Sequence, residues 1–129
     1  MTEVRKKLNL PKSCHLRHSS DFKRLRENGK RLVCGRFVFN WLPLSEGSQS
    51  KIGIVTTRRL GSSVVRNRAR RLLREVYRIH QYDLTQPAEI VLVARNGIKE
   101  SKFSDVEHDY LKALHKAGLL KNSSENSSK

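Results

Sequence analysis

The sequence predicts an α+β domain, a two-layer sandwich of helices on a sheet, with the element order α-β-β-α-β-α. Two stretches, 62–79 and 101–120, carry apolar residues at the helical period and therefore predict amphipathic helices. Runs rich in β-branched and aromatic residues predict strands, and a short further helix is expected near the N-terminus. The length of 129 residues suits one domain with a modest core.

The first helix is expected within "HSSDFKRLRENGK". The hydroxyl of Ser19 or Ser20 can accept a hydrogen bond from a backbone N–H of the first turn and so cap the helix. Phe22 and Leu25 stand three residues apart on one face, and Gly29 is expected to end the helix.

Three strands are predicted from composition. The stretch "RLVCGRFVFNWLPL" predicts a strand near 33–42, and "KIGIVTT" predicts a second, short one. Because only the turn-like "SEGSQS" separates them, these two strands are expected to form an antiparallel hairpin. The nearly continuous apolar run in "AEIVLVARNG" predicts a strand that is covered on both faces.

The helix at 62–79 has the clearest pattern, and Ser62 or Ser63 can cap it. At about 100° per residue, its apolar side chains fall on one broad face that is expected to pack on the core. That face holds Val65, Ala69, Leu72, Leu73, Val76 and Tyr77.

The same helix lies in "GSSVVRNRARRLLREVYR", which contains six arginines and one glutamate. A helix exposed only to water normally alternates Glu with Lys or Arg, whereas arginines here repeat at i,i+4 and each such pair costs about 0.2–0.5 kcal/mol. Because the planar guanidinium group matches phosphate oxygens, the pattern favours a phosphate-binding face over a solvated one. Asn67, Arg70, Arg71, Arg74 and Arg78 lie opposite the apolar face, and Arg66 and Arg68 flank it.

The last helix is expected within "SKFSDVEHDYLKALHKAGLL", capped at Ser104. Glu107 and Asp109 are expected on its solvent face or as charges near its N-terminus. The candidate core residues of this helix are Val106, Tyr110, Leu111 and Leu114.

The net charge of +15, with a pI near 10.5, belongs to the first two thirds of the chain. Residues 1–80 hold 20 Lys and Arg against 5 Asp and Glu, whereas residues 81–129 hold 7 of each. Such a directed field favours polyanions through electrostatic steering and counterion release. Nucleic acid is therefore the leading expected partner, and an anionic membrane surface is the second.

The predicted organisation is a basic N-terminal arm at 1–16, in which Pro11 breaks any helix, a single domain at 17–120 and a disordered polar tail at 121–129. No apolar run has the length of a signal peptide or a membrane span. Cys14 and Cys34 lack the spacing of a disulfide framework or a zinc site, so a cytoplasmic protein with reduced thiols is expected.

Few side chains outside the arginine helix indicate a chemical role. Phe22 and Phe37 lie among basic residues and could stack on unpaired bases, although core packing is the more usual role of an aromatic ring. His15 and His18 form an H-x-x-H beside Cys14 without the further ligands that zinc requires. The sequence has no phosphate-binding glycine loop and no nucleophile elbow, so no catalytic residue and no metal site are predicted in the protein.

The stretch "KIGIVTTRRLGSSVVRNRARRLLREVYR" resembles the protein subunit of bacterial ribonuclease P, whose hallmark is "G-[I/L]-x-V-S-K-K-x-G-x-A-V-x-R-N-R". The resemblance extends to "DFKRLRENGKR", "GRFVFNWLP" and "AEIVLVARNG", and it covers most of the chain. It implies a compact α/β sandwich like domain 2 of ribosomal protein S5, with a mixed sheet and a left-handed β-α-β crossover. Because about 98% of parallel crossovers are right-handed, this feature rests on the resemblance alone.

The resemblance also implies two regions that bind RNA. In this family the R-N-R helix faces the catalytic RNA, and a cleft between the first helix and one sheet face holds the single-stranded 5′ leader of precursor tRNA. This chain departs from the pattern where Arg26 replaces a second aromatic residue, "TRR" replaces "SKK", and Ser62 stands where Asn is common. By position, the catalytic RNA is expected to contact Arg66, Asn67, Arg68, Arg70, Arg71 and Arg74, and the leader is expected to contact Phe22, Arg26, Phe37, Asn40, Arg58 and Arg59.

The function that this resemblance implies is that of an accessory subunit in an endoribonuclease. The catalytic RNA hydrolyses one phosphodiester bond and leaves the mature 5′ end of the tRNA, while the protein docks on that RNA and captures the leader. Mg²⁺ is expected as the cofactor, held mainly by the RNA subunit. Neither a membrane nor DNA is expected as a partner.

Three other functions use part of the same pattern. A structural or ribosomal RNA-binding protein needs the basic helix but no leader cleft. A helix-turn-helix DNA regulator would use 63–78 as its recognition helix, but it requires a helix just upstream, where "KIGIVTT" resembles a strand. A metal-dependent protein nuclease lacks support, because no paired carboxylates accompany the basic residues.

Overall fold

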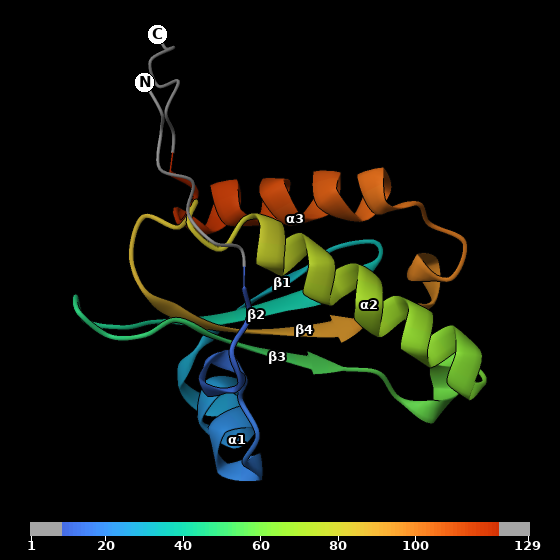
Figure 1. The fold of residues 1–129 in the computed structure, drawn as a ribbon, viewed down its shortest axis with the longest axis horizontal. Helices are drawn as coiled ribbons and strands as arrows, with labels where there is room; N and C mark the ends of the chain where they lie inside the picture. The colour runs from blue at the N-terminus through green and yellow to red at the C-terminus, as the bar shows by residue number, and fades with distance from the viewer. Residues whose placement is uncertain (1–8, 122–129) are drawn as a thin grey trace, which may run out of the picture.

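The computed structural model describes residues 9–121. A sheet lies between α2 and α3, which cover one face, and α1, which covers part of the other (Figure 1). The predicted order α-β-β-α-β-α is present, with β1 as an additional strand. The helices are α1 (Ser19–Asn28), α2 (Ser63–Ile79) and α3 (Phe103–Ala117), the strands are β1 (Lys30–Val33), β2 (Phe37–Pro43), β3 (Lys51–Val55) and β4 (Ala88–Ala94), and the 3-10 turns are η1 (Lys12–Cys14), η2 (Arg58–Leu60) and η3 (Asn96–Ile98).

The four strands form one mixed sheet in the order β1-β2-β4-β3. β2 pairs antiparallel with β1 and with β4, and β3 pairs parallel with β4. The predicted hairpin between β2 and β3 was wrong, because β4 lies between these two strands. The position of β4 follows from its composition, since a strand that is apolar on both faces is buried best in the middle of a sheet.

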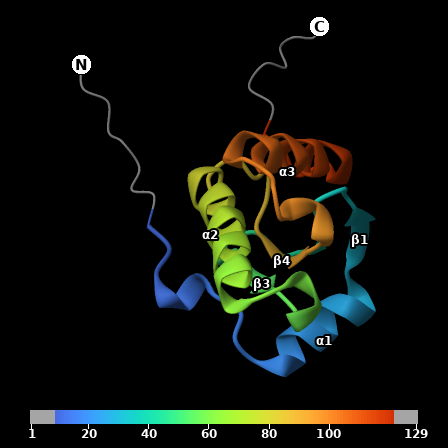
Figure 2. The same cartoon turned by 90° about the vertical axis from the view of Figure 1, so that its right-hand side faces the viewer.

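The β3-α2-β4 connection is left-handed, as the family resemblance implies. In Figure 2 the parallel strands β3 and β4 point toward the viewer, and the chain passes clockwise from β3 up to α2 and across to β4. A right-handed crossover with the same strand order would place α2 on the face that α1 occupies. The hand of this connection therefore keeps the arginine helix and α1 on opposite faces of the sheet.

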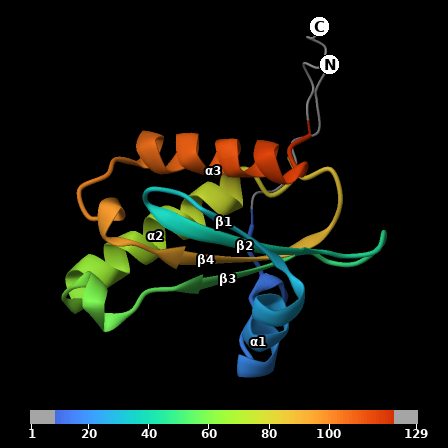
Figure 3. The ribbon, with the colours of Figure 1, turned by 180° about the vertical axis from the view of Figure 1, so that it is seen from behind.

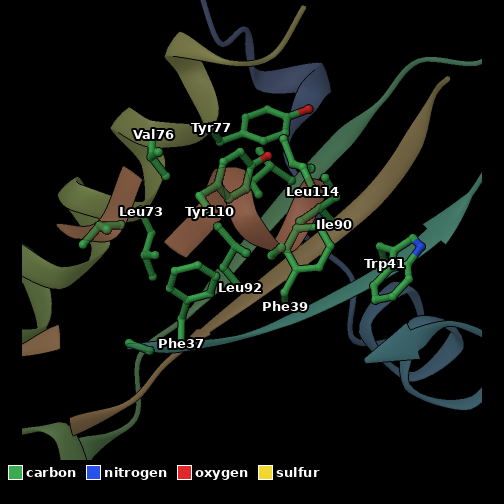
Figure 4. Packing of buried hydrophobic residues seen from close by; sticks show 14 of the residues in the cluster. Phe37, Phe39, Trp41, Leu73, Val76, Tyr77, Ile90, Leu92, Tyr110 and Leu114 are labelled. Atoms are coloured by element: carbon green, nitrogen blue, oxygen red, sulfur yellow. The ribbon is translucent and has the colours of Figure 1, made fainter. Parts of the chain in front are cut away.

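The main core fills the space between the sheet and the helices α2 and α3. Alternate residues of β2, Phe37, Phe39 and Trp41, point into it, and the ring of Phe39 lies 5.3 Å from that of Trp41 and 5.9 Å from that of Tyr110 (Figure 4). These contacts bury the apolar faces that the helical period predicts. The other labelled core residues are Leu73, Val76, Tyr77, Ile90, Leu92 and Leu114.

On the opposite face, α1 packs against a smaller apolar cluster centred on Leu16, Leu25 and Val91. Arg24 ties the helix to the sheet, because it forms an ion pair with Glu89 of β4 and a second one with Asp21 (3.1 Å). Figure 3 shows α1 leading into β1, which runs beside β2 at the edge opposite β3. α1 covers only part of this face and leaves a groove beside it.

The two ends of α1 agree with the sequence pattern to different degrees. Gly29 ends the helix as predicted, and a Cβ at this position would lie 2.6 Å from the carbonyl oxygens of Leu25 and Trp41. The predicted cap by Ser19 or Ser20 was wrong, because the helix begins at Ser19 and the N-cap residue, His18, makes no capping hydrogen bond through its side chain.

The second half of the predicted N-terminal arm lies along the sheet. The backbone N–H of Leu16 donates a hydrogen bond to the carbonyl oxygen of Ile52 (2.9 Å), and His15 forms an isolated parallel bridge with the same residue. The predicted arm at 1–8 and most of the tail, 122–129, lie outside the described residues. Between residues 9 and 121, no helix combines the length and the apolar character needed to cross a membrane.

The acidic residues of α3 are tied to neighbouring elements. Asp109 accepts a hydrogen bond from Arg36 (2.9 Å), and Glu107 contacts His80 Nε2 (2.8 Å) just beyond the C-terminal end of α2. A solvent-facing position, one of the two roles predicted for these residues, was therefore wrong for Asp109, whereas the Glu107 side chain is 33% exposed and pairs with His80. Asp83 pairs with the other ring nitrogen of His80 (2.7 Å), so two carboxylates flank one imidazole.

The His80 cluster is expected to stabilise the fold more at low pH than at high pH. Burial lowers the pKa of His80, but its hydrogen bonds with Asp83 and Glu107 outweigh burial and raise the pKa above its usual value. This contribution to the free energy of unfolding is complete below the unfolded pKa, about 6.5, and is lost as the pH rises through the folded pKa.

The variant His80→Gln is expected to lower the free energy of unfolding by about 1–2 kcal/mol near pH 5.5, and by clearly less near pH 8.5. Urea unfolding of both proteins at the two pH values measures the difference. His108→Gln is the matched control, because His108 is an exposed residue of α3 outside the cluster. A difference that stays constant or grows with pH would contradict the prediction.

Candidate nucleic-acid interface

The arginines of α2 are presented by a firmly anchored helix. Ser62, one of the two predicted caps, caps it, since its Oγ accepts a hydrogen bond from the backbone N–H of Val65 (3.3 Å). Ala69, Leu73 and Val76 are buried against the sheet and α3. Because the apolar face is used for packing, the arginine face is held outward.

Three of these arginines are oriented by neutral oxygen atoms. Their guanidinium groups donate to backbone carbonyls, hydroxyls and one side-chain amide at distances of 2.6–3.3 Å. Such acceptors fix the position of a guanidinium group and leave its positive charge uncompensated. The acceptors are Gly61 O and Ser63 Oγ for Arg66, Lys99 O and Ser101 O for Arg68, and Thr56 Oγ1 and Asn67 Oδ1 for Arg70.

Arg71 and Arg74 are exposed, and neither has a polar partner among residues 9–121. The one acidic residue of the helix, Glu75, accepts a hydrogen bond from Arg78 Nε (3.0 Å), and this contact lowers the pKa of Glu75. In the described part of the chain, none of the five arginines predicted to bind RNA forms an ion pair with a carboxylate. The face therefore carries a net positive charge that no acid of residues 9–121 pairs with directly.

The outward side chains of α2 line two different grooves. The first, of about 530 Å³, lies between α2 and the start of α3, and we call it the α3 groove. The second, of about 440 Å³, lies between α2 and the edge strand β3, and we call it the β3 groove. Arg68, Arg71, Arg74 and Phe103 line the α3 groove with Leu72 and Glu75, whereas Arg70 and Arg74 line the β3 groove with Leu10, His15, Leu16, Phe22, Ile52, Gly53 and Ile54.

A third groove, of about 550 Å³, lies on the opposite face of the sheet beside α1, and we call it the central groove. Apolar side chains of α1 and of β2, β3 and β4 line it together with three basic residues. None of its lining residues in the described chain is acidic. They are Phe22, Leu25, Arg26, Gly29, Lys30, Arg31, Val38, Asn40, Val55, Val91 and Val93.

The structure brings Phe22, Arg26 and Asn40, three of the residues predicted to bind the leader, together in the central groove. Asn40 Nδ2 donates to the carbonyl oxygen of Val91 (3.3 Å), and within residues 9–121 the side-chain oxygen of Asn40 accepts no hydrogen bond. Arg58 and Arg59 do not line this groove, because the chain leaves the sheet after Val55 and places them in η2.

The prediction that Phe37 binds the leader was wrong. Phe37 is completely buried in the main core, on the face of the sheet that packs against α2 and α3. Side chains of a strand alternate between the two faces, so Phe37 and Phe39 share the core face while Val38 and Asn40 face the groove.

Sequence reasoning missed the basic edge of the central groove and most of its floor. Lys30 and Arg31 belong to β1, a strand that was not predicted as separate from β2. Val38 could have been assigned to the groove from the sequence, because residues two apart in a strand share a face and Val38 stands two residues before Asn40. Val91 and Val93 could not have been assigned to the groove from the sequence, because β4 is apolar on both faces and its pattern does not show which face lines the groove.

The described chain holds no group of three or more His, Cys, Asp or Glu side chains that could bind a metal ion. His80 with its two carboxylates is a structural cluster between α2 and α3. The grooves present guanidinium groups, which can bind phosphates, and apolar and aromatic surface, which can bind bases.

The amino-acid sequence is similar to that of known proteins over most of its length. The family model described as Ribonuclease P matches residues 10–118. The "Ribonuclease P protein component" of Syntrophomonas wolfei subsp. wolfei is 37% identical over 111 residues, which cover 86% of this chain and 92% of that protein. The "Ribonuclease P protein component" of Dictyoglomus thermophilum is 34% identical over 116 residues, which cover 88% of this chain and 95% of that protein.

Solved structures show the same fold. The RNase P protein from Thermotoga maritima aligns with a TM-score of 0.69 and 27% identity, over 79% of this chain and 96% of that one. The RNase P protein of Staphylococcus aureus aligns with a TM-score of 0.75, over 84% of this chain and 99% of that one. Because the two sequences are only 23% identical, this alignment supports the fold and nothing further. Because the family model and both curated relatives match nearly the whole described chain, the protein belongs to the ribonuclease P protein family.

Proposed function

We propose that this chain is the protein subunit of a ribonuclease P ribonucleoprotein that acts in the cytoplasm. It docks on the catalytic RNA through the outward face of α2, and it binds the single-stranded 5′ leader of precursor tRNA in the central groove. The RNA subunit carries out the endonucleolytic cleavage. The protein assists by adding affinity for the substrate.

One observation carries this proposal: the domain has two basic surfaces of different character on opposite faces of its sheet. The face of α2 presents guanidinium groups without direct acidic partners, which suits the closely spaced phosphates of a folded RNA. The central groove combines an apolar floor, one aromatic ring and a basic rim, which suits an unpaired strand with exposed bases. A structural RNA-binding protein needs only the first surface.

In the proposed reaction, water is added across one phosphodiester bond of the precursor. The leader departs with a 3′-hydroxyl group, and the mature tRNA keeps the 5′-phosphate. Residues 9–121 offer no cluster of acidic side chains that fits Mg²⁺, so we propose that the RNA subunit holds this ion. The positive face of α2 reduces repulsion among nearby phosphates, which is expected to lower the Mg²⁺ concentration that the RNA requires.

The variant Phe22→Ala tests the role of the central groove. It is expected to weaken the binding of precursor tRNA to the reconstituted ribonucleoprotein about tenfold, because stacking on an aromatic ring contributes about 1–3 kcal/mol per base. Binding of mature tRNA, which has no leader, is expected to stay unchanged. The measurement is the Kd of both tRNAs, with catalytic RNA from the same organism.

Leu42→Ala is the matched control for lost packing. Leu42 packs against the same apolar cluster as Phe22 but is not among the residues that line the groove. An equal loss for precursor and mature tRNA would argue against a leader site at Phe22. A reconstituted particle that does not accelerate 5′ maturation would overturn the proposed function as a whole.

A further inference from the structure

Phe22 lines two of the grooves at once. It contributes to the central groove beside α1 and also to the β3 groove, whose far side is formed by α2. The two grooves therefore meet at one aromatic ring. One of these grooves lies on the side of the sheet that holds α1, and the other lies between the edge strand β3 and the arginine helix.

The crossing point is shaped by the contact between Phe22 and Gly53. A Cβ at position 53 would lie 2.7 Å from Cε1 and 3.0 Å from Cζ of the Phe22 ring, so the ring rests directly on the backbone of β3. Leu16 lies beside it, because its backbone N–H is bonded to Ile52 and a Cβ on Gly53 would lie 3.4 Å from the Cβ of Leu16. Together Phe22, Gly53 and Leu16 form an apolar contact at the boundary that the two grooves share.

Two arginines on the α2 side of the β3 groove, Arg70 and Arg74, form no ion pair with a carboxylate of residues 9–121 and can therefore bind an anion. Arg70 is held there by Thr56 Oγ1 and Asn67 Oδ1, both at 2.6 Å, so its charge is fixed in place and uncompensated by an acid. Arg74 is exposed, without a polar partner in residues 9–121. Among the described residues, neither this groove nor the central groove has an acidic residue in its lining.

We propose that the single-stranded RNA in the central groove continues past Phe22, across β3, to Arg70 and Arg74. The physical argument is charge and shape complementarity, since an unpaired strand binds best where a cationic track follows an apolar surface that carries aromatic rings. The inference rests on the proposed function, because the strand in question is the 5′ leader.

This path divides the arginine face between two RNA molecules. Arg70 contacts the leader, whereas Arg68 and Arg71, which line the α3 groove, contact the catalytic RNA. Arg74 lines both grooves and lies where the two RNA molecules meet. The family resemblance assigns all of these residues to the catalytic RNA, so the proposed division between two RNA molecules comes from the tertiary structure.

NMR of the isolated protein can show which grooves a single-stranded RNA contacts. An unstructured RNA oligonucleotide of about eight nucleotides is titrated into the isotope-labelled full chain, and the shifts of backbone and side-chain signals are recorded. Signals of Leu25 and Val93 are expected to report the central groove, those of Gly53 and Ile54 the β3 groove, and that of Phe103 the α3 groove. Saturable shifts are expected in the first two sets and not at Phe103.

Two neighbouring arginines provide a matched pair of variants. Arg70→Gln is expected to remove the shifts at Gly53 and Ile54, to keep those at Val93, and to weaken oligonucleotide binding about tenfold. The slope of log K against log salt concentration should become shallower by about 0.7, the value for one phosphate of a single strand. Arg71→Gln removes the same charge one residue away and is expected to keep the shifts at Gly53 and Ile54.

Arg74→Gln separates loss of the path from loss of the fold. Arg74 makes no polar contact in the described chain, so this variant is expected to reduce the shifts at Ile54 and leave the rest of the spectrum unchanged. Shifts confined to the central groove, or equal effects of Arg70→Gln and Arg71→Gln, would overturn the proposed path. If either of these results is found but the reconstituted particle still cleaves in a leader-dependent manner, the path is rejected and the proposed function stands. If the oligonucleotide shifts signals along both grooves but the protein does not stimulate cleavage, the proposed function is rejected and the path stands.

Discussion

The double variant Arg71→Glu, Arg74→Glu is expected to bind the catalytic RNA about a thousandfold more weakly than the natural protein. Each arginine loses a charge-assisted hydrogen bond to phosphate, and each new carboxylate adds repulsion against the same phosphate. Electrophoretic or filter-binding titration of the catalytic RNA measures the loss. These two residues are the sharpest choice, because both are exposed and make no polar contact in residues 9–121.

The fold of this double variant is expected to remain intact. A glutamate at position 74 stands i,i+4 from Arg70 and Arg78, so two like-charge pairs become favourable pairs worth about 0.2–0.5 kcal/mol each, which offsets the new repulsion between Glu75 and a glutamate at position 71. The circular dichroism spectrum should therefore match that of the natural chain. Lys112→Glu, Lys116→Glu is the matched control, since it makes the same change in charge on exposed residues of α3. An equal loss of affinity in the control would mean that overall charge, and not the face of α2, governs docking.

The affinity of the chain for its catalytic RNA is expected to fall steeply with salt. If about six to eight phosphates are neutralised, the binding constant should drop by about 10³–10⁵ between roughly 50 and 200 mM monovalent salt, because each contact releases condensed counterions. Removing one phosphate contact with Arg71→Gln should make the slope of log K against log salt concentration shallower by about 1. A nearly flat plot for the natural chain would exclude the arginine face as the main docking surface.

The arginine helix was predicted from the sequence to within one residue, and Ser62 is one of the two residues predicted to cap it. Capping and the 3.6-residue period are local, because they depend on side chains that are close together in the sequence. The burial of Leu73 and Val76 confirms the predicted apolar face. The apolar run of β4 is likewise a local feature, and it led to the correct prediction that nearly all of this strand is buried, although Val91 and Val93 border the central groove.

The errors fall where distant segments meet. The hairpin between β2 and β3 looked favourable because a short turn joins them, yet pairing with β4 buries more apolar surface on both strands. Phe37 was assigned to the leader site together with Asn40 by the family resemblance, although the two-residue period of a strand places these two side chains on opposite faces of the sheet. Asp109 was expected in solvent because nothing local to α3 indicates that Arg36 lies beside it.

Taken alone, the amino-acid sequence determined the excess of positive charge, the amphipathic arginine helix and, through the resemblance, the family. The tertiary structure decided which of those arginines share a groove with Phe22 and which face α3. The physical reason is that a helix directs its side chains by a local period, whereas the neighbours they meet depend on the strand order and on the hand of the β3-α2-β4 crossover. Both are set by burial summed over the whole sheet, and no short stretch of sequence carries that information.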